Sequence, residues 1–280
     1  GYKDDNLDKI KKTAEAKGMH LIVYDVGDDY VEDVIKNPKH GMGSAFNSCL
    51  DCHRYMLQKA KRIMEEIGAE FVFSGEVLGQ RPMSQRREAL DIVEKESGLS
   101  GLLLRPLSAK LLEETLVEKK GLVDRTKLLS IHGRGRSQQV VLAKNLGLDK
   151  FPQPSGGCKF TDKNARSRFT AIRGISKNMN WQDLELVIIG RHFNLNDGYY
   201  LILARDIKEC NKLFKYKKKG SFIEAKDMGG SKAILINYAL DDLRNKEKEI
   251  ISASIVARYT KIPEHHEGLL DIVFHNPNGK

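Results

Sequence analysis

The chain contains 280 residues, which allows one large domain or two of ordinary size. Hydrophobic residues make up 40% of it and no stretch has a biased composition, so we predict a folded protein with packed cores. No apolar run approaches the ~20 residues that span a bilayer. The N-terminus also lacks the charged and apolar regions of a signal peptide. These features argue against a membrane protein and predict a cytoplasmic location.

The positive charge of the chain is concentrated in its C-terminal part. The formal net charge is +9, and residues 151–280 hold 22 Lys and Arg against 15 Asp and Glu. A basic region of this kind is typical of proteins that bind a polyanion such as RNA. A soluble, lysine-rich surface gives the same composition, so charge alone leaves both interpretations open.

Apolar periodicity in the first part of the chain predicts helices that alternate with short buried strands. Such an alternation indicates an α/β fold with a parallel sheet covered by helices on both faces. Ligands of these sheets bind at the carboxyl ends of the strands, where the glycine-rich turn 75–85 is expected. The expected helices cover residues 4–17, 28–35, 55–67, 84–96, 111–119, 125–130 and 136–146, and the expected strands 21–24, 71–73 and 102–104.

The pattern changes after a segment with two prolines and two glycines, residues 151–157. We therefore predict two domains, an α/β domain over residues 1–160 and a smaller, basic α+β domain over residues 164–280. In the second domain, strands are expected at residues 184–189, 199–204 and 233–236, and helices at 208–214 and 240–257.

Four cysteines without an export signal do not suggest a disulfide framework. Cys49 and Cys52 form a C-x-x-C pair just ahead of a helix, where the helix dipole is expected to lower thiol pKa values. The pair fits a redox site, a structural zinc site, or an iron–sulfur cluster that takes Cys158 as its third ligand. Cys210 falls within a helical pattern and is interpreted as a small buried hydrophobic residue.

Two further segments could contact phosphate groups. The turn after the strand at residues 71–73 contains Gly75 and Gln85, and its backbone N–H groups could hold a nucleotide, although it lacks the Walker motif. Residues 132–136 form a short basic segment in which Arg134 and Arg136 could contact RNA phosphates, or could lie in an ordinary solvated loop.

Three motifs in the expected α/β domain resemble the 4-thiouridine synthetase family of tRNA sulfurtransferases. Residues 74–80 read S-G-E-V-L-G-Q with a following Ser84-Gln85, residues 54–56 read R-Y-M, and residues 104–107 read L-R-P-L. The resemblance implies a PP-loop ATP-pyrophosphatase fold, which is Rossmann-like and belongs with the adenine nucleotide alpha hydrolases. It also implies ATP with Mg2+ as cofactor, with Arg54, Gly75 and Gln85 in the nucleotide site.

Related thiolases hold a 4Fe-4S cluster through three cysteines, which implies a metal site of Cys49, Cys52 and Cys158 here. One family motif is absent, because no S-G-G-x-D-S loop occurs in this chain. The interpretations are that this loop precedes residue 1, that another chain supplies it, or that ATP is not used. For this reason the sequence leaves it uncertain whether the chain is an enzyme by itself.

A second resemblance lies in the expected C-terminal domain. Residues 189–194 read I-G-R-H-F-N, a G-Y-Y strand follows at residues 198–200, and residues 255–259 read I-V-A-R-Y. These segments are similar to the RNA-binding domain of NFACT proteins, which implies nucleic-acid contact through Arg191 and neighbouring basic residues.

The leading hypothesis is therefore ATP-dependent uridine thiolation of tRNA, with Asp51 as a candidate acid/base group or, alternatively, a helix cap. The expected partners are tRNA or another structured RNA and a sulfur donor, and a homo-oligomer is compatible with the sequence. A first alternative is a non-catalytic RNA-binding protein in which the cysteines hold structural zinc. A second is a sulfur relay through a Cys52 persulfide that Cys158 resolves.

Overall fold

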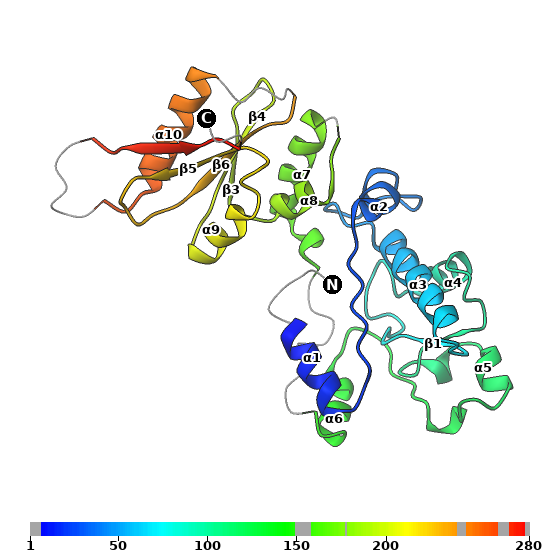
Figure 1. Ribbon diagram of the computed structural model, residues 1–280. Helices are drawn as coiled ribbons and strands as arrows, with labels where there is room; N and C mark the ends of the chain where they lie inside the picture. The colour runs from blue at the N-terminus through cyan, green and yellow to red at the C-terminus, as the bar shows by residue number, and fades with distance from the viewer. Residues whose placement is uncertain (1–6, 149–157, 177, 240–244, 263–268, 278–280) are drawn as a thin grey trace. The chain divides into compact units, whose positions relative to one another are not determined.

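The computed structural model describes residues 7–148, 158–176, 178–239, 245–262 and 269–277. The chain forms two compact units (Figure 1). Unit 1 consists of residues 1–43 and 47–158, and unit 2 of residues 44–46 and 159–280. No helix among the described residues is long and apolar enough to cross a membrane.

Most helices of unit 1 lie where the apolar spacing predicts them, although their bounds differ, and the helix expected at residues 125–130 is only a 3-10 turn. The long helix expected from residue 111 is instead a 3-10 turn and a separate short helix, each fixed by local hydrogen bonds. The helical elements are α1 (Leu7–Ala16), α2 (Asp28–Tyr30), π-helix η1 (Val31–Lys36), α3 (Cys49–Glu66), α4 (Arg87–Glu96), η2 (Ala109–Leu111), α5 (Leu116–Lys119), η3 (Arg125–Lys127) and α6 (Ser137–Asn145).

Helix α3 begins six residues earlier than expected, with Cys49 as its first residue. Its apolar residues Tyr55, Leu57 and Met64 are buried, and Leu57 and Met64 pack in a cluster with Val93 of α4. The cysteine pair therefore forms the first turn of a helix that is anchored along its length in the core of unit 1.

The sheet of unit 1 is smaller than the sequence predicts. Strands β1 (Val72–Phe73) and β2 (Leu103–Leu104) form a parallel pair, and within the described residues unit 1 contains no other strands. The predicted buried strand at residues 21–24 is wrong, because this segment is not paired and Ile22, Val23 and Tyr24 are exposed. The full PP-loop sheet expected from the resemblance is therefore not seen; what is present is an α/β arrangement around one parallel pair.

Unit 2 is built on a five-stranded antiparallel sheet with the order β3-β4-β6-β5-β7. Its elements are η4 (Lys159–Thr161), α7 (Lys163–Ile175), α8 (Trp181–Val187), β3 (Arg191–Asn194), β4 (Tyr199–Leu203), α9 (Ile207–Phe214), β5 (Ser221–Ala225), β6 (Ala233–Asn237), α10 (Lys246–Tyr259) and β7 (Ile272–His275). This sheet and its helices agree with the expected α+β class.

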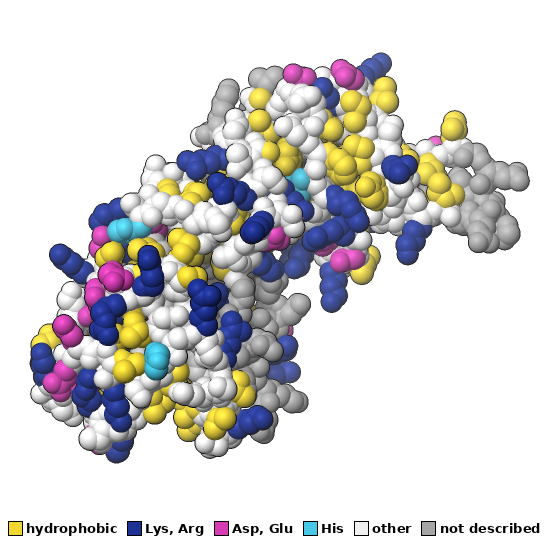
Figure 2. Space-filling view, turned by 180° about the vertical axis from the view of Figure 1, so that it is seen from behind, with side chains coloured by type: hydrophobic (Ala, Val, Ile, Leu, Met, Phe, Trp, Pro, Cys, Tyr) yellow, Lys and Arg dark blue, Asp and Glu magenta, His cyan; other side chains and the backbone are white. Residues whose placement is uncertain are grey.

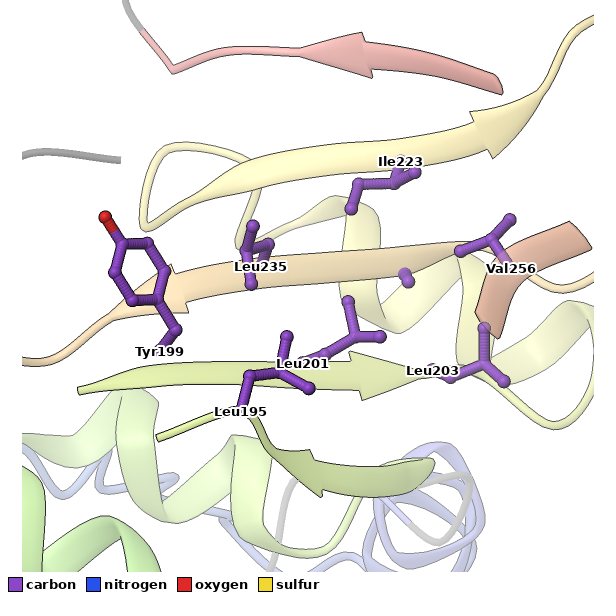
Figure 3. Packing of buried hydrophobic residues seen from close by; sticks show 8 residues of the cluster. Leu195, Tyr199, Leu201, Leu203, Ile223, Leu235 and Val256 are labelled. Carbon is purple, nitrogen blue, oxygen red and sulfur yellow. The ribbon is translucent and has the colours of Figure 1, made fainter. Parts of the chain in front are cut away.

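The main apolar core of unit 2 lies between α10 and the sheet (Figure 3). Leu201 and Leu203 of β4, Ile223 of β5 and Leu235 of β6 pack with Val256 of α10. Because successive residues of a strand point to opposite faces, Phe222, next to Ile223, lies on the other face, where its ring meets Phe214 of α9. Helices α10 and α9 thus cover opposite faces of the sheet.

The predicted strand at residues 184–189 is wrong, because residues 181–187 form α8 instead. Asn180 accepts the backbone N–H of Asp183 at 3.2 Å, and the Asp183 carboxylate accepts the backbone N–H of Asn180 at 2.9 Å. This capping box starts a helix, and it overrides the strand preference of the apolar residues that follow. Strands β3, β5 and β7 and helix α7 were not predicted from the sequence.

Candidate functional site

The first turn of α3 places two thiols side by side in unit 1. Asn47 donates from its side-chain amide to the Cys49 sulfur at 3.0 Å, and the Tyr30 hydroxyl donates to the Cys52 sulfur at 3.3 Å. The third thiol, that of Cys158, is exposed and belongs to the same unit. Tyr30 comes close to the Cys52 sulfur only in the folded chain, whereas Asn47 lies two positions before Cys49 in the sequence.

The pKa values of these thiols move in the direction opposite to the one expected from the helix dipole. Burial raises the pKa of Cys49 and of Cys52, and the charge of Cys158 raises both pKa values further. The hydrogen bonds from Asn47 and Tyr30 lower the pKa values but do not offset burial. Burial thus favours the neutral thiol at Cys49 and Cys52, and the charge of Cys158 acts in the same direction.

Three interacting thiols provide the soft donor set that zinc and iron–sulfur clusters prefer. Within the described part of the chain, however, no group of three or more His, Cys, Asp or Glu side chains has the geometry of a metal site. Two buried oxygens beside Cys49, Asn47 Oδ1 and Ser48 Oγ, have no hydrogen-bond partner among the described residues. The donor chemistry thus fits a metal or cluster, whereas the ligating arrangement is not formed in this structure.

Asp51, the candidate acid/base group, is fully buried. Its two carboxylate oxygens accept the backbone N–H groups of Lys39 and His40 at 3.1 and 3.0 Å, and the guanidinium of Arg54 lies 3.7 Å away. This geometry is typical of a carboxylate that fixes a loop to a helix. Asp51 therefore holds the segment before the thiols in place, and we assign it no proton-transfer role.

The three motif segments of unit 1 meet in one buried network. Glu76 accepts hydrogen bonds from Arg105 Nε at 3.0 Å and from Ser74 Oγ at 2.9 Å, and its other oxygen lies 2.7 Å from His53 Nδ1. Burial raises the pKa of Glu76, but the bond to His53 and the charge of Arg105 outweigh it and lower the pKa to about 2. The Glu76 carboxylate is thus ionised at neutral pH, and its hydrogen bonds connect α3, the glycine turn and the residue after β2.

The proposed nucleotide-binding residues have different surroundings. Arg54 donates to Asp33 at 2.9 Å and is thereby tied to η1. Gly75 has open space beside its α-carbon, and its φ angle requires no glycine. The Gln85 side chain is buried with its Oε1 unpaired among the described residues, while its backbone carbonyl accepts the Gly79 N–H at 2.6 Å.

The glycine turn and the basic segment, far apart in sequence, lie next to one another in unit 1. Leu78 forms a parallel bridge with His132, and the Gly133 N–H donates to the Leu78 carbonyl at 2.8 Å. A pocket of about 360 Å³ opens here, and Arg134 and Arg136, which follow Gly133 in the sequence, are exposed. Its lining residues are Leu78, Gly79, Arg87, Leu111, His132 and Gly133.

In unit 2, Arg191 lies on the edge strand β3 and is exposed. Its guanidinium carbon is 4.9 Å from the ring centroid of Tyr259, the last residue of α10, and the Phe193 and Tyr259 rings are 6.5 Å apart. Tyr259 is 37% exposed. Sequence reasoning identified Arg191 but not this aromatic pair, which strand β3 and helix α10 bring together.

Lys and Arg side chains are numerous on the surface, and they gather beside hydrophobic side chains on one face of unit 2 (Figure 2). Cations next to exposed aromatic rings are a common feature of single-stranded nucleic-acid sites, because phosphates pair with the cations and bases stack on the rings. The surface of unit 2 therefore has the chemistry of a polyanion-binding domain.

Comparison with protein families agrees with this chemistry for unit 2. Residues 190–280 match the model of the NFACT protein RNA binding domain. Family comparison gives no support to a sulfurtransferase domain in the first part of the chain. No curated protein matches the chain, and no solved structure matches it. Residues 190–280 are therefore similar to the NFACT RNA-binding domain, which indicates RNA binding and supports RNA as a partner of this protein.

Proposed function

We propose that unit 2 binds structured RNA, such as tRNA, and that the thiols of unit 1 take part in sulfur transfer to a base of that RNA. The observation that carries the RNA-binding part is the family match over residues 190–280, together with the exposed Arg191 guanidinium beside Tyr259. The sulfur-transfer part is supported by the three interacting thiols of unit 1.

Cys49, Cys52 and Cys158 would hold an iron–sulfur cluster, which would supply the chemistry for binding sulfide. The chain's own residues would orient these ligands, since Asn47 and Tyr30 already donate hydrogen bonds to two of the sulfurs. Hydrogen bonds to cluster sulfurs tune reduction potential and ligand orientation. ATP with Mg2+ would activate the base, and the pocket at Gly79, Arg87 and His132 is the candidate place for the nucleotide.

The RNA-binding part is tested by titrating the full chain with a tRNA transcript at several salt concentrations. Arg191→Gln is expected to weaken binding. The slope of the logarithm of the binding constant against the logarithm of the salt concentration should fall by about 1, as expected for the loss of one phosphate contact. Lys127→Gln is the matched control, because Lys127 is a strongly exposed cation of unit 1. If the wild type and Arg191→Gln bind the tRNA with equal affinity, Arg191 does not contact RNA. If the wild type does not bind the tRNA, the proposed RNA-binding function is wrong.

The thiol part is tested by measuring iron, zinc and acid-labile sulfide in anaerobically purified protein. Cys49→Ala and Cys158→Ala are compared with Cys210→Ala, a control because Cys210 is buried in unit 2. Iron and sulfide that disappear in the first two variants but not in the control support the cluster. Zinc with the same pattern supports a structural site in a non-catalytic RNA-binding protein instead.

A persulfide relay is the remaining alternative, supported by the electrostatic effect of Cys158 on the Cys52 thiol. A sulfane-sulfur donor, such as a protein persulfide, would pass its outer sulfur to Cys52; transfer of that sulfur to the activated base, with attack of Cys158 on Cys52, would leave a Cys52–Cys158 disulfide that a thiol reductant restores. The relay predicts no metal after reconstitution with iron and sulfide, and a trapped Cys52–Cys158 disulfide. Mass spectrometry of thiolated nucleosides, after incubation of RNA with the protein, ATP and either sulfide or a sulfane-sulfur donor with a thiol reductant, then tests the reaction itself. Unmodified nucleosides in every condition would leave RNA binding as the function.

A further inference from the structure

We propose that the outer side of α9 is a second RNA-contacting surface, specific for an unpaired base and the phosphates beside it. The surface, here named the α9 patch, consists of Ile207, Phe214, Lys215, Lys217 and Lys218. This inference rests on the proposed RNA binding of unit 2 and adds to it a site on the sheet face opposite Arg191 and Tyr259.

The α9 patch exposes apolar side chains that a small helix would ordinarily bury. Ile207 is 70% exposed and Phe214 is 51% exposed, whereas Cys210 and Leu213 of the same helix are buried against unit 2. The Phe214 ring is held edge-on against the buried Phe222, with the centroids 5.4 Å apart and the planes at 83°. Phe214 is therefore an exposed ring in a fixed orientation, as a stacking platform requires.

One lysine ammonium lies over this ring, and two further exposed lysines are near it in the sequence. Lys215, Lys217 and Lys218 are all exposed, and the Lys217 ammonium lies 4.4 Å from the Phe214 ring centroid. Between them, the Tyr216 hydroxyl bonds to the Glu185 carboxylate at 2.5 Å, which fixes the backbone of the lysine run. The neighbouring Lys219 differs from these three lysines, because its ammonium forms an ion pair with the buried Asp183 carboxylate and is not part of the exposed patch.

The nearby acidic groups offset only part of this positive charge, since Glu185 is one carboxylate beside three exposed lysines. Glu209 of α9 is paired with Arg205, and Asp206 accepts the backbone N–H of Glu209 at 2.9 Å as the helix cap. The patch is therefore a cluster of cations around an oriented aromatic ring. Phosphates pair with such cations, and a base stacks on such a ring regardless of its identity.

The ligand is expected to be unpaired RNA, because the faces of paired bases are covered within a duplex. The strand alternation at Phe222 and Ile223 puts the α9 patch on one face of the sheet and the Arg191–Tyr259 pair on the face of α10. A structured RNA with both a helical part and a single-stranded end could use the two surfaces together.

The test measures binding of the full chain to a fluorescent oligouridine and to an RNA duplex of equal length. Phe214→Ala is expected to weaken oligouridine binding by about 5- to 150-fold, the range for loss of one stacked base, with a smaller effect on the duplex. Phe214→Trp should preserve binding, since it keeps an aromatic face. The triple variant Lys215→Gln, Lys217→Gln, Lys218→Gln should reduce the salt slope by about 2.

Lys127→Gln is again the charge control, and Trp181 fluorescence during unfolding checks that unit 2 remains folded in each variant. Oligouridine affinities equal to wild type in both Phe214→Ala and the lysine variant would overturn the α9 patch, while weakened binding in Arg191→Gln would keep the proposed function. Wild-type protein that binds neither RNA would overturn both. Binding to anionic vesicles is measured for the same proteins. If Phe214→Ala or the lysine variant loses vesicle binding while its RNA affinity equals that of the wild type, the patch is a membrane-contacting surface and the inference is overturned.

Discussion

The sheets of the two units differ in how completely their apolar strands are covered. All five residues of β4 in unit 2 are buried, because β4 pairs with β3 and β6 and helices cover the sheet on both faces. Strand β1 of unit 1 has one strand partner, and its Phe73 is 70% exposed. Similar apolar strand sequences therefore reach opposite degrees of burial according to the neighbours that the fold gives them.

The interiors differ in chemistry as well. Unit 2 has an apolar core between α10 and its sheet, whereas unit 1 holds Glu76, Arg105 and His53 in one hydrogen-bonded network. An apolar core depends on close packing, and a buried ion network depends on the ionised carboxylate. Unit 1 is thus expected to be sensitive to the loss of single charges, and unit 2 to the loss of packing volume.

The largest effect is expected when the charged network is broken. Arg105→Leu removes the donors to Glu76 and Glu94 and leaves the buried Glu76 carboxylate with fewer partners. Removal of one member of a buried ion pair typically costs about 3–5 kcal/mol. Hydrogen exchange of β1, β2 and α3 should accelerate accordingly, while exchange of β4 in unit 2 serves as the internal control. Unchanged exchange in unit 1 would mean that the network contributes little stability.

A matched pair of truncations compares the two sheets directly. Leu201→Ala removes a fully buried side chain from β4 and should reduce the free energy of unfolding of unit 2 by about 2–5 kcal/mol. Phe73→Ala removes a mostly exposed ring from β1, and we expect a change within about 0.5 kcal/mol. Denaturant unfolding followed by Trp181 fluorescence reports on unit 2, and hydrogen exchange on unit 1. A large loss in Phe73→Ala would show that another surface covers this ring.

Acidification should weaken the units in separate pH ranges. Burial and the charge of Arg168 lower the pKa of His192 to about 4, so between pH 6.5 and 4 the unfolded chain binds a proton that folded unit 2 excludes. The pKa of Glu76 is lowered to about 2, so unit 1 loses the corresponding stability between pH 4.5 and 2. Each shift is worth about 3 kcal/mol.

The measurement is the unfolding free energy of each unit across this pH range. His192→Asn should abolish the pH dependence of unit 2 between pH 6.5 and 4, and Glu76→Gln should abolish that of unit 1 between pH 4.5 and 2. Unit 2 should weaken first as the pH falls. A single transition in which both units lose stability over the same pH range would contradict the assignment of the two groups.

The smallest effect is expected at Gly75, and Gly190 provides the contrast. A Cβ at Gly75 meets no atom within 4 Å, so Gly75→Ala should change stability by less than about 1 kcal/mol. A Cβ at Gly190 would lie 2.4 Å from the Leu203 carbonyl oxygen, at a φ of +73°, so Gly190→Ala should strongly destabilise unit 2. If a nucleotide approaches the backbone at Gly75, isothermal titration of Gly75→Ala with ATP should show weaker binding than wild type.

Several features were determined by the sequence alone. Helical patterns placed α1, α4, α6, α9 and α10, and in α4 and α9 the buried residues lie three or four positions apart, as one covered face requires. The basic C-terminal composition and the G-R-H-F-N segment indicated RNA binding, and the family match over residues 190–280 agrees with them. The sequence also paired Cys49 with Cys52, but it put the pair ahead of the helix, whereas the structure places both residues in the first turn of α3.

Tertiary structure decided what local patterns leave open. Residues 21–24 and Phe73 have strand composition, but burial of a strand requires neighbours that residue preferences do not specify. The pKa values of Cys49 and Cys52 depend on burial and on Cys158, more than a hundred positions away. The pairing of Arg191 with Tyr259 likewise joins distant segments. Local spacing sets which helices form, whereas burial, ionisation and surface chemistry depend on long-range contacts, which exist only once the chain has folded.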